Sequence, residues 1–391
     1  MRPSTPGFIG ARLREARDVR GISAVALSEI ANVSPQAISQ YENGRSSPSP
    51  DVLGRIASAV NLPVPFFTRP PRDRTDGTIF YRSMSSATKA SRARAERRFA
   101  WLHDIEEYLS DYVAFPDVNI PDLDLPADPL LLSDAEIDDA ANQVRAHWGM
   151  RNGPIANMVA LLENQGAIVA RDRLNAEALD GLSEVAANDR PFVLIGIDKG
   201  TPVRWRFDAA HELGHVLLHR HLQPETLLRP EQYKRVEQQA HRFAASFLLP
   251  TAEFGDDFFA VNLDALVALK PKWKVSVAMM IMTAQRAGFI NEDSARRLWI
   301  NYSRHGWRRN EPYDDSMDIE EPRLLRRAVE LTVSGGTQSA DDITSALALP
   351  AADVETLCNL PSGYLGDFAP VSLRAASSGE RTHNVIPFRR L

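Results

Sequence analysis

Residues 206–218 read Arg-Phe-Asp-Ala-Ala-His-Glu-Leu-Gly-His-Val-Leu-Leu, and this stretch decides the fold at the centre of the chain. Its mostly apolar composition predicts a buried helix. His211 and His215 lie four residues apart and therefore share one helix face, about 6 Å from each other. Two histidines held in this way can bind one metal ion, and Glu212 can reach a water molecule on that ion. The H-E-x-x-H spacing is typical of zinc sites in which the glutamate is the general base.

The same spacing also occurs by chance on helices that bind no metal. The apolar flanks favour a metal site, because a buried histidine pair and a buried carboxylate are costly without partners, and a metal ion supplies one. Zinc lowers the pKa of its water to about 7, so Glu212 can accept the proton as that water attacks a peptide carbonyl. Asp208, one turn before His211, either orients a ligand or caps the helix.

A zinc site of this kind needs a third protein ligand, and the downstream sequence offers four candidates: His219, His221, Glu237 and His241. His219 is disfavoured, because it lies about 12 Å along the helix axis from His211. His221 has the spacing of the third histidine in the H-E-x-x-H-x-x-G-x-x-H pattern, but Leu218 stands where that pattern has glycine. Glu237 and His241 lie four apart on the next predicted helix, which can cross the first and present either one.

The first 68 residues predict a bundle of short helices. Ser23 can cap the second helix, Asn32 suits a tight turn, and Ser34 followed by Pro35 can open a third helix that ends before Gly44. Two short helices joined by such a turn form the helix-turn-helix arrangement, whose second helix enters the DNA major groove. A plain helical bundle for protein contact is the alternative.

Six side chains of that second helix and the following loop are the predicted DNA contacts. Glutamine pairs with adenine, a small alanine admits a thymine methyl group, and the loop residues suit phosphates. The predicted contacts are Gln36, Ala37, Ser39, Gln40, Asn43 and Arg45.

Two stretches resemble known families. Residues 33–45, which read Val-Ser-Pro-Gln-Ala-Ile-Ser-Gln-Tyr-Glu-Asn-Gly-Arg, resemble the XRE (lambda-repressor-like) regulators, and the similarity covers residues 8–67. Residues 206–215 and 237–250 resemble the ImmA/IrrE metallopeptidases, and this similarity covers about residues 133–255.

The second resemblance implies a gluzincin-type site. Glu237 begins an E-x-x-A-x-x-F-A helix and would complete a Zn²⁺ site with His211 and His215, while Glu212 would be the catalytic base. His241 would assist catalysis, serve as an orienting group or alternative ligand, or be an ordinary polar group on a helix flank. Relatives of this kind cleave a partner repressor that carries a similar helix-turn-helix, often in prophage, mobile-element or stress-response settings.

Two non-enzymatic alternatives stay open. The metallopeptidase fold can serve as a sensor or structural module on a transcriptional repressor, or the chain can be an antitoxin-like interaction protein. The expected partners are double-stranded operator DNA and a protein substrate with a helix-turn-helix domain, and a homodimer would suit a palindromic operator.

We therefore expect a multidomain chain with four parts. An all-α helix-turn-helix bundle (1–68) precedes a linker and long helix (69–132), an α+β gluzincin-like metallopeptidase domain (133–255) and a mostly α-helical C-terminal region of unknown role (256–391). Residues 69–80 read as linker and 86–114 as the long helix. Ser133 and Glu136 predict a capping box at the start of the next domain, residues 154–164 read as a helix, and a polar tail begins at Ser377. Residues 191–197 read as a strand that can accept an extended substrate by strand addition.

Charge and composition narrow the function classes further. The net charge of −6 argues against general nucleic-acid coating, whereas residues 69–98 carry nine basic and three acidic residues. The basic residues that begin the long helix either contact DNA phosphates or form a solvated face; they are Lys89, Arg92, Arg94, Arg97 and Arg98. No apolar run is long enough to span a membrane, no secretory signal is visible, and Cys358 is the only cysteine, so we expect a cytoplasmic protein without disulfides.

Overall fold

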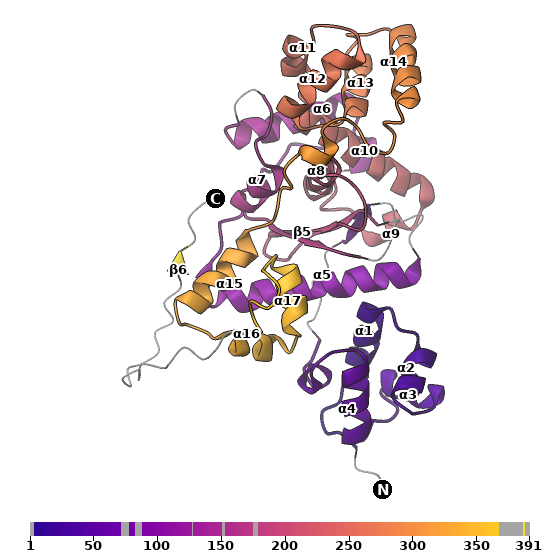
Figure 1. The fold of residues 1–391 in the computed structure, drawn as a ribbon, viewed down its shortest axis with the longest axis vertical. Helices are drawn as coiled ribbons and strands as arrows, with labels where there is room; N and C mark the ends of the chain where they lie inside the picture. Colours follow the sequence, from indigo (N-terminus) through magenta and orange to yellow (C-terminus); the bar gives the residue numbers. More distant parts are fainter. Residues whose placement is uncertain are drawn as a thin grey trace.

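The computed structural model describes residues 4–71, 78–82, 88–126, 128–150, 153–174, 179–366 and 386–387. The helix-turn-helix helices lie at one end of the molecule, a small sheet lies in the middle, and the helices of residues 251–304 lie at the other end (Figure 1). The predicted fold class is confirmed: a helical N-terminal region, an α+β domain and a helical C-terminal region. No helix among the described residues has the length and apolar character needed to cross a membrane.

The N-terminal helices begin and end where the sequence predicts. Gly21 ends the first helix with φ of 64°, and Asn32 adopts a φ of 52° in the turn between the helix pair. The side chains of Ser23 and Ser34 accept hydrogen bonds from the first turns of the next helices. The elements are α1 (Gly10–Arg20), α2 (Ala24–Ile30), α3 (Pro35–Glu42), α4 (Pro50–Ala59) and the 3-10 helix η1 (Val64–Phe67).

The long helix α5 (Lys89–Ser110) connects the N-terminal helices to the sheet. Ser86, where we expected it to begin, lies outside the described residues. The basic cluster was expected to contact DNA phosphates or to form a solvated face, and both expectations are wrong for Arg98. Its guanidinium is buried and forms ion pairs with Asp172 and Asp353, with its Nε 2.5 Å from Asp172 Oδ2. Arg98 therefore joins parts of the fold and faces neither DNA nor solvent.

The central sheet has the strand order β1-β4-β5-β3. Strand β5 pairs in parallel with β3 and antiparallel with β4, so it has no free edge, and the prediction that residues 191–197 accept a substrate strand is wrong. A short strand that the sequence did not predict pairs antiparallel with the outer edge of β4. The strands are β1 (Phe80–Arg82), β3 (Ile168–Asp172), β4 (Gly181–Val185) and β5 (Pro191–Gly196).

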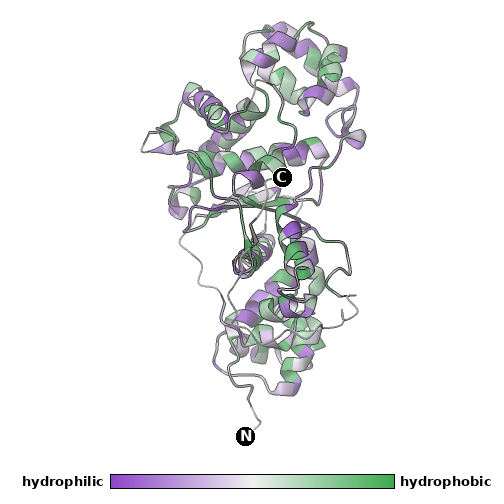
Figure 2. Ribbon diagram, turned by 90° about the vertical axis from the view of Figure 1, so that its left-hand side faces the viewer, coloured by the Kyte–Doolittle hydropathy of each residue, from purple (hydrophilic) through white to green (hydrophobic). Residues whose placement is uncertain are grey.

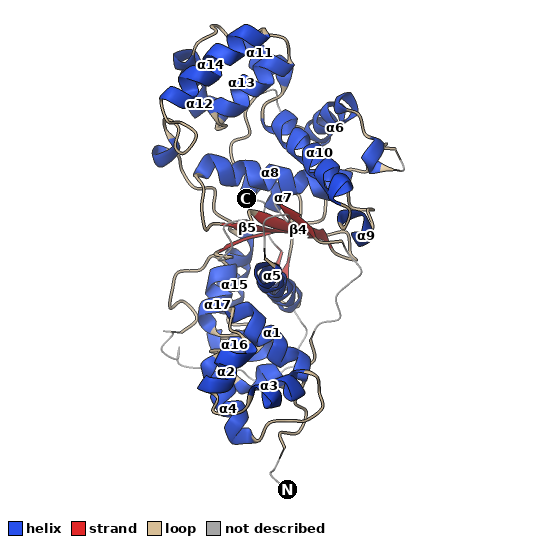
Figure 3. Ribbon diagram, turned by 90° about the vertical axis from the view of Figure 1, so that its right-hand side faces the viewer, coloured by secondary structure: helices blue, strands red, loops and turns tan. Residues whose placement is uncertain are grey.

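Helices cover both faces of this sheet. Helix α8 lies on one face and α5 on the other (Figure 3), and green apolar residues run along the strands between them (Figure 2). The predicted capping box at Ser133 is present, but the helix predicted from Pro154 begins only at Met158. The elements of this part are η2 (Pro129–Leu131), α6 (Asp134–His147), α7 (Met158–Asn164), α8 (Pro202–Leu218), α9 (Pro224–Leu227) and α10 (Pro230–Leu248).

The C-terminal region forms two separate groups of helices. The first group packs beyond α10 and comprises α11 (Thr251–Asp257), α12 (Leu263–Trp273), α13 (Val277–Arg286), α14 (Glu292–Arg304) and η3 (Asp314–Ser316). The second group returns to pack beside α5 (Figure 1) and comprises α15 (Leu324–Ser334), α16 (Ala340–Leu347) and α17 (Ala351–Leu357). Val113–Ala114 (β2) pairs in parallel with Ile386–Pro387 (β6), while most of the polar tail predicted from Ser377 lies outside the described residues.

Candidate metal centre and DNA-reading face

The candidate metal centre lies where helices α8 and α10 cross. At the crossing a β-carbon on Gly214 would stand 3.1 Å from the Cα of Ala240, which is tighter than most such contacts, so glycine favours this close approach of the two backbones. Glu237 lies one helical turn before Ala240 and therefore faces His211 and His215 on α8. Gly214 therefore allows the close helix crossing that brings Glu237 next to His211 and His215.

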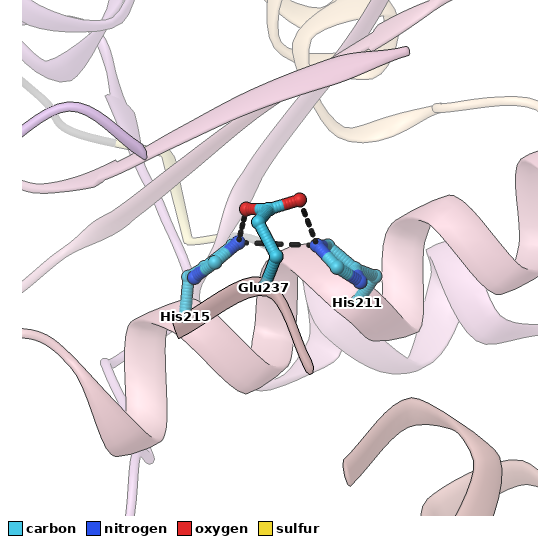
Figure 4. Close-up of side chains that lie close together, drawn as sticks. All are labelled: His211, His215 and Glu237. Carbon is cyan, nitrogen blue, oxygen red and sulfur yellow. Dashed lines mark hydrogen bonds and ion pairs between the residues drawn. The ribbon is translucent and has the colours of Figure 1, made fainter. Parts of the chain in front are cut away.

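Three side chains of this centre converge on one point. Nε2 of His211 and Nε2 of His215 are 3.1 Å apart, and the two oxygens of Glu237 lie 3.2 Å from Nε2 of His215 and 3.6 Å from Nε2 of His211. Figure 4 shows each carboxylate oxygen facing one imidazole. Ligand atoms about 2.1 Å from a tetrahedral zinc ion stand roughly 3.4 Å from one another, so this donor set fits the ion.

The same three residues are the group that could hold a metal ion among the described residues. Burial alone raises the pKa of Glu237, but the hydrogen bonds and charges of His211 and His215 hold the pKa of that carboxyl well below its usual range. Glu237 is therefore an anion next to two imidazoles, which are the ligand types that zinc binds in catalytic sites.

A hydrogen-bonded chain behind the centre orients His215. Nε2 of Gln239 donates to the carbonyl oxygen of Pro129, so Oε1 of Gln239 accepts from Nε2 of His219 over 3.0 Å. Nδ1 of His219 then accepts from Nδ1 of His215 over 3.1 Å, which leaves Nε2 of His215 with its lone pair toward the metal position. Burial holds the pKa of His219 well below its usual range, so this ring is neutral, as the hydrogen-bonded chain requires.

Glu212 is buried between α8 and the edge of the sheet. Ser183 of β4 donates a hydrogen bond to its Oε2. A β-carbon on Gly181, two residues earlier on β4, would stand 2.8 Å from its Oε1, so glycine there leaves room for the carboxylate. Strand β4 therefore binds the predicted general base through Ser183 and leaves space for it at Gly181.

The other predicted residues have different positions. His241 is exposed, its ring centroid is 6.4 Å from that of His211, and it lines the same cavity of about 800 Å³ as His211 and Glu237. His221 follows the end of α8, is exposed and accepts a hydrogen bond from Arg220. Asp208 is buried within α8, and because Thr201 caps this helix, the prediction that Asp208 caps it is wrong.

The predicted DNA-reading residues lie on or just after α3. Gln36, Ser39, Gln40, Asn43 and Arg45 are exposed, and Ala37 is half-buried. The amide of Asn43 is already engaged in the fold, since it donates to the Ser39 carbonyl over 2.8 Å and accepts from Arg14. Five of the six side chains are therefore exposed, and Asn43 also helps to end α3.

Sequence reasoning missed three residues around the metal centre. Phe80 of β1 is buried and stacks on the ring of His215, with centroids 4.9 Å apart and planes 8° apart. Ser183 holds Glu212, and Gln239 holds His219. The aromatic and β-branched run Ile79-Phe80-Tyr81 was the only local signal for β1, and it is short enough to pass as linker.

Comparisons with known proteins agree with this geometry. The Peptidase_M78 family model, described as the IrrE N-terminal-like domain, matches residues 162–285, and a helix-turn-helix family model matches residues 13–67. The HTH-type transcriptional regulator SutR of Escherichia coli (strain K12) is 35% identical over 68 residues, which is 17% of this chain; the chain spans only 38% of that relative's length. The chain therefore combines an XRE-type helix-turn-helix DNA-binding region with a domain of the IrrE/ImmA-like peptidase family.

Proposed function

We propose that this chain is a DNA-binding transcriptional regulator whose second domain is a zinc-dependent peptidase for one specific partner protein. The convergence of His211, His215 and Glu237 next to the buried Glu212 carries the proposal. A protein that carries its own helix-turn-helix, such as a repressor, is the substrate that we infer from the family resemblance.

Each residue of the centre has a defined role in this function. His211, His215 and Glu237 would hold zinc, which when bound supplies an acidified water and polarises a peptide carbonyl. Glu212, held by Ser183, accepts the proton at its carboxylate and returns it to the leaving amine. His241 lines the cavity beside the ligands and is placed to contact bound peptide.

The surroundings of the centre have room for a polypeptide. The cavity beside the ligands and a neighbouring cavity of about 490 Å³ share His241, Met282 and Arg286 among their lining residues. The cleft therefore continues past the metal centre toward α13 and the loop after α14.

Metal content is the first test of the proposal. Purified wild-type chain should contain about one zinc ion, and the variants His215→Ala and Glu237→Ala should lose it because each removes one of three ligands. Elemental analysis measures this directly. Glu212→Gln is the matched control, since it alters a neighbouring carboxylate outside the ligand set and should keep the metal. A wild-type chain without metal after supply of zinc would overturn the peptidase assignment.

A comparison of wild type and Glu212→Gln then separates the enzyme from the non-enzymatic repressor. Each protein is incubated with an extract of the source cells, and newly formed protein N-termini are identified by mass spectrometry. A peptidase yields new N-termini with the wild type only. If Glu212→Gln retains zinc and both proteins give the same N-termini, the domain is a sensor or structural module.

A further inference from the structure

The outer edge of β4 is the natural place for a substrate of this centre, and the chain's own strand β1 already occupies it. Glu212 accepts a hydrogen bond from Ser183 and lies against Gly181 of β4, so a peptide that pairs with this strand passes beside the general base. Strand β1 pairs with it antiparallel, Phe80 opposite Ser183 and Arg82 opposite Gly181. Extended peptides commonly bind proteins by adding a strand in this way.

The side chain of Phe80 fills an apolar pocket next to the metal ligands. One face of its ring stacks on His215, and its buried apolar neighbours are Leu222, Leu227 and Val236. The ring is only 2% exposed. The pocket therefore accepts one large apolar side chain from whichever strand lies on β4.

Three side-chain hydrogen bonds of the described residues add to the ladder that holds β1. Thr78 donates to the carbonyl oxygen of Leu222 over 2.6 Å, and the hydroxyl of Tyr233 donates to the carbonyl oxygen of Tyr81 over 3.0 Å. The hydroxyl of Tyr81 donates to Glu96 on α5 over 2.6 Å. A three-residue strand with these contacts is a segment that another peptide can replace.

The position of β1 in the chain also connects it to the DNA-binding region. It lies between the N-terminal helices and α5, and Trp101 of α5 donates a hydrogen bond to Glu15 of α1 over 2.8 Å. The strand that covers the edge of β4 therefore lies in the sequence between two helices that contact each other, one of them in the DNA-binding region.

We propose that β1 is an internal blocking strand that occupies the substrate position of the metal centre, and that the substrate is an extended peptide segment presenting a large apolar side chain to the Phe80 pocket. This inference rests on the proposed function and names the recognition element of the same site. Substrate must displace β1 to pair with β4, so this strand position is closed until a partner or a rearrangement of the N-terminal helices releases it, while the cleft on the other side of the ligands stays open.

A labelled peptide with the sequence of residues 77–84, Gly-Thr-Ile-Phe-Tyr-Arg-Ser-Met, tests the proposal on the full-length protein. A strand tethered within the chain competes at an effective concentration on the order of millimolar, so wild type should not bind the peptide at micromolar concentration. The variant Phe80→Asp places a charge in the apolar pocket, releases β1 and should bind the peptide at least about 10-fold more tightly than wild type, as measured by fluorescence anisotropy.

Matched controls make the result specific. Phe80→Leu keeps a large apolar side chain and should behave like wild type, and a peptide with aspartate in place of phenylalanine should not bind Phe80→Asp. Hydrogen exchange should become faster in residues 181–185 of Phe80→Asp and stay unchanged in β3, which pairs with β5 at the far side of the sheet from β1. If Phe80→Asp does not fold, Tyr233→Phe removes one hydrogen bond to β1 and should give a smaller shift in the same direction.

Equal binding of the peptide by wild type and Phe80→Asp, or no binding by a folded Phe80→Asp, would overturn the blocking role. The measurement is made in the presence of a chelator, so its outcome does not depend on zinc or on cleavage. If the chain contains no zinc but still exchanges β1 for the peptide, the peptidase assignment is wrong, and the binding of an extended peptide to β4 stands.

Discussion

The DNA-reading face and the metal centre use side chains in opposite environments. Gln36, Ser39 and Gln40 project from α3 into solvent and contribute almost nothing to the core beneath them, which Ile38 forms on the same helix. His211 and His215 are 1% and 0% exposed, and they lie inside the packing between two helices and a strand.

On the DNA-reading face, function and stability depend on different side chains. At the metal centre, the same side chains contribute to both. Exposed side chains can change without affecting the fold, because surface substitutions usually alter the free energy of unfolding by less than about 0.5 kcal/mol. Buried polar side chains depend on their partners, and removing one partner leaves the other desolvated and unpaired. Variants in the two regions should therefore differ in whether a loss of function comes with a loss of stability.

The largest loss of stability is expected at Arg98, whose buried charge links α5 to β3 and α17. Replacement by methionine leaves Asp172 and Asp353 buried without their shared cation and should cost about 3–5 kcal/mol of unfolding free energy. Asp353 also pairs with Arg20 of α1 over 2.6 Å, so the attachment of the N-terminal helices is weakened as well. Urea denaturation followed by tryptophan fluorescence measures the change.

Lys89→Met is the matched control for Arg98→Met, because Lys89 begins the same helix and is exposed. It should change the unfolding free energy by less than about 0.5 kcal/mol. A similar loss in both variants would mean that the positive charge of α5 matters as a whole, and that the buried ion pairs carry no special weight.

The basic cluster at the start of α5 shows what the sequence alone could not predict. Five basic residues at a helix start look alike in the sequence, and the partners that single out Arg98 lie 74 and 255 residues away. Helix starts, by contrast, depend on neighbouring residues, so the caps at Ser23, Ser34 and Ser133 were predictable.

The metal centre was likewise predictable from the sequence only in part. The local spacing of His211 and His215 placed both on one helix face, but spacing left four candidates for the third ligand. Only the family resemblance favoured Glu237, whose position depends on how closely α10 crosses α8 at Gly214. Strand β1 was missed because its partner strand β4 lies about a hundred residues away in the sequence. The three residues of β1 also show no local periodicity that would predict a strand.

A smaller effect, on metal affinity, is expected at His219. Its hydrogen bond to His215 orients that ring, and loss of such an orienting partner typically weakens metal binding by 10- to 100-fold. His219→Ala should therefore retain the site but bind zinc about 10- to 100-fold more weakly in competition with a chelating dye. His221→Ala is the control, because that ring is exposed and lies outside α8. An equal loss in both variants would contradict the orienting role.

The smallest effect on stability is expected on the DNA-reading face. Gln40→Ala removes a side chain suited to pair with adenine and should cost about 1–3 kcal/mol in binding to a DNA site selected by the full-length protein from a random pool. Arg45→Ala should weaken binding to all sequences alike and lower the slope of log affinity against log salt by about 1, because its expected contact is a phosphate. Both variants should unfold within about 0.5 kcal/mol of wild type, since both side chains are exposed. If Gln40→Ala lowers stability as much as affinity, the reading face is part of the core after all, and the contrast between the two regions fails.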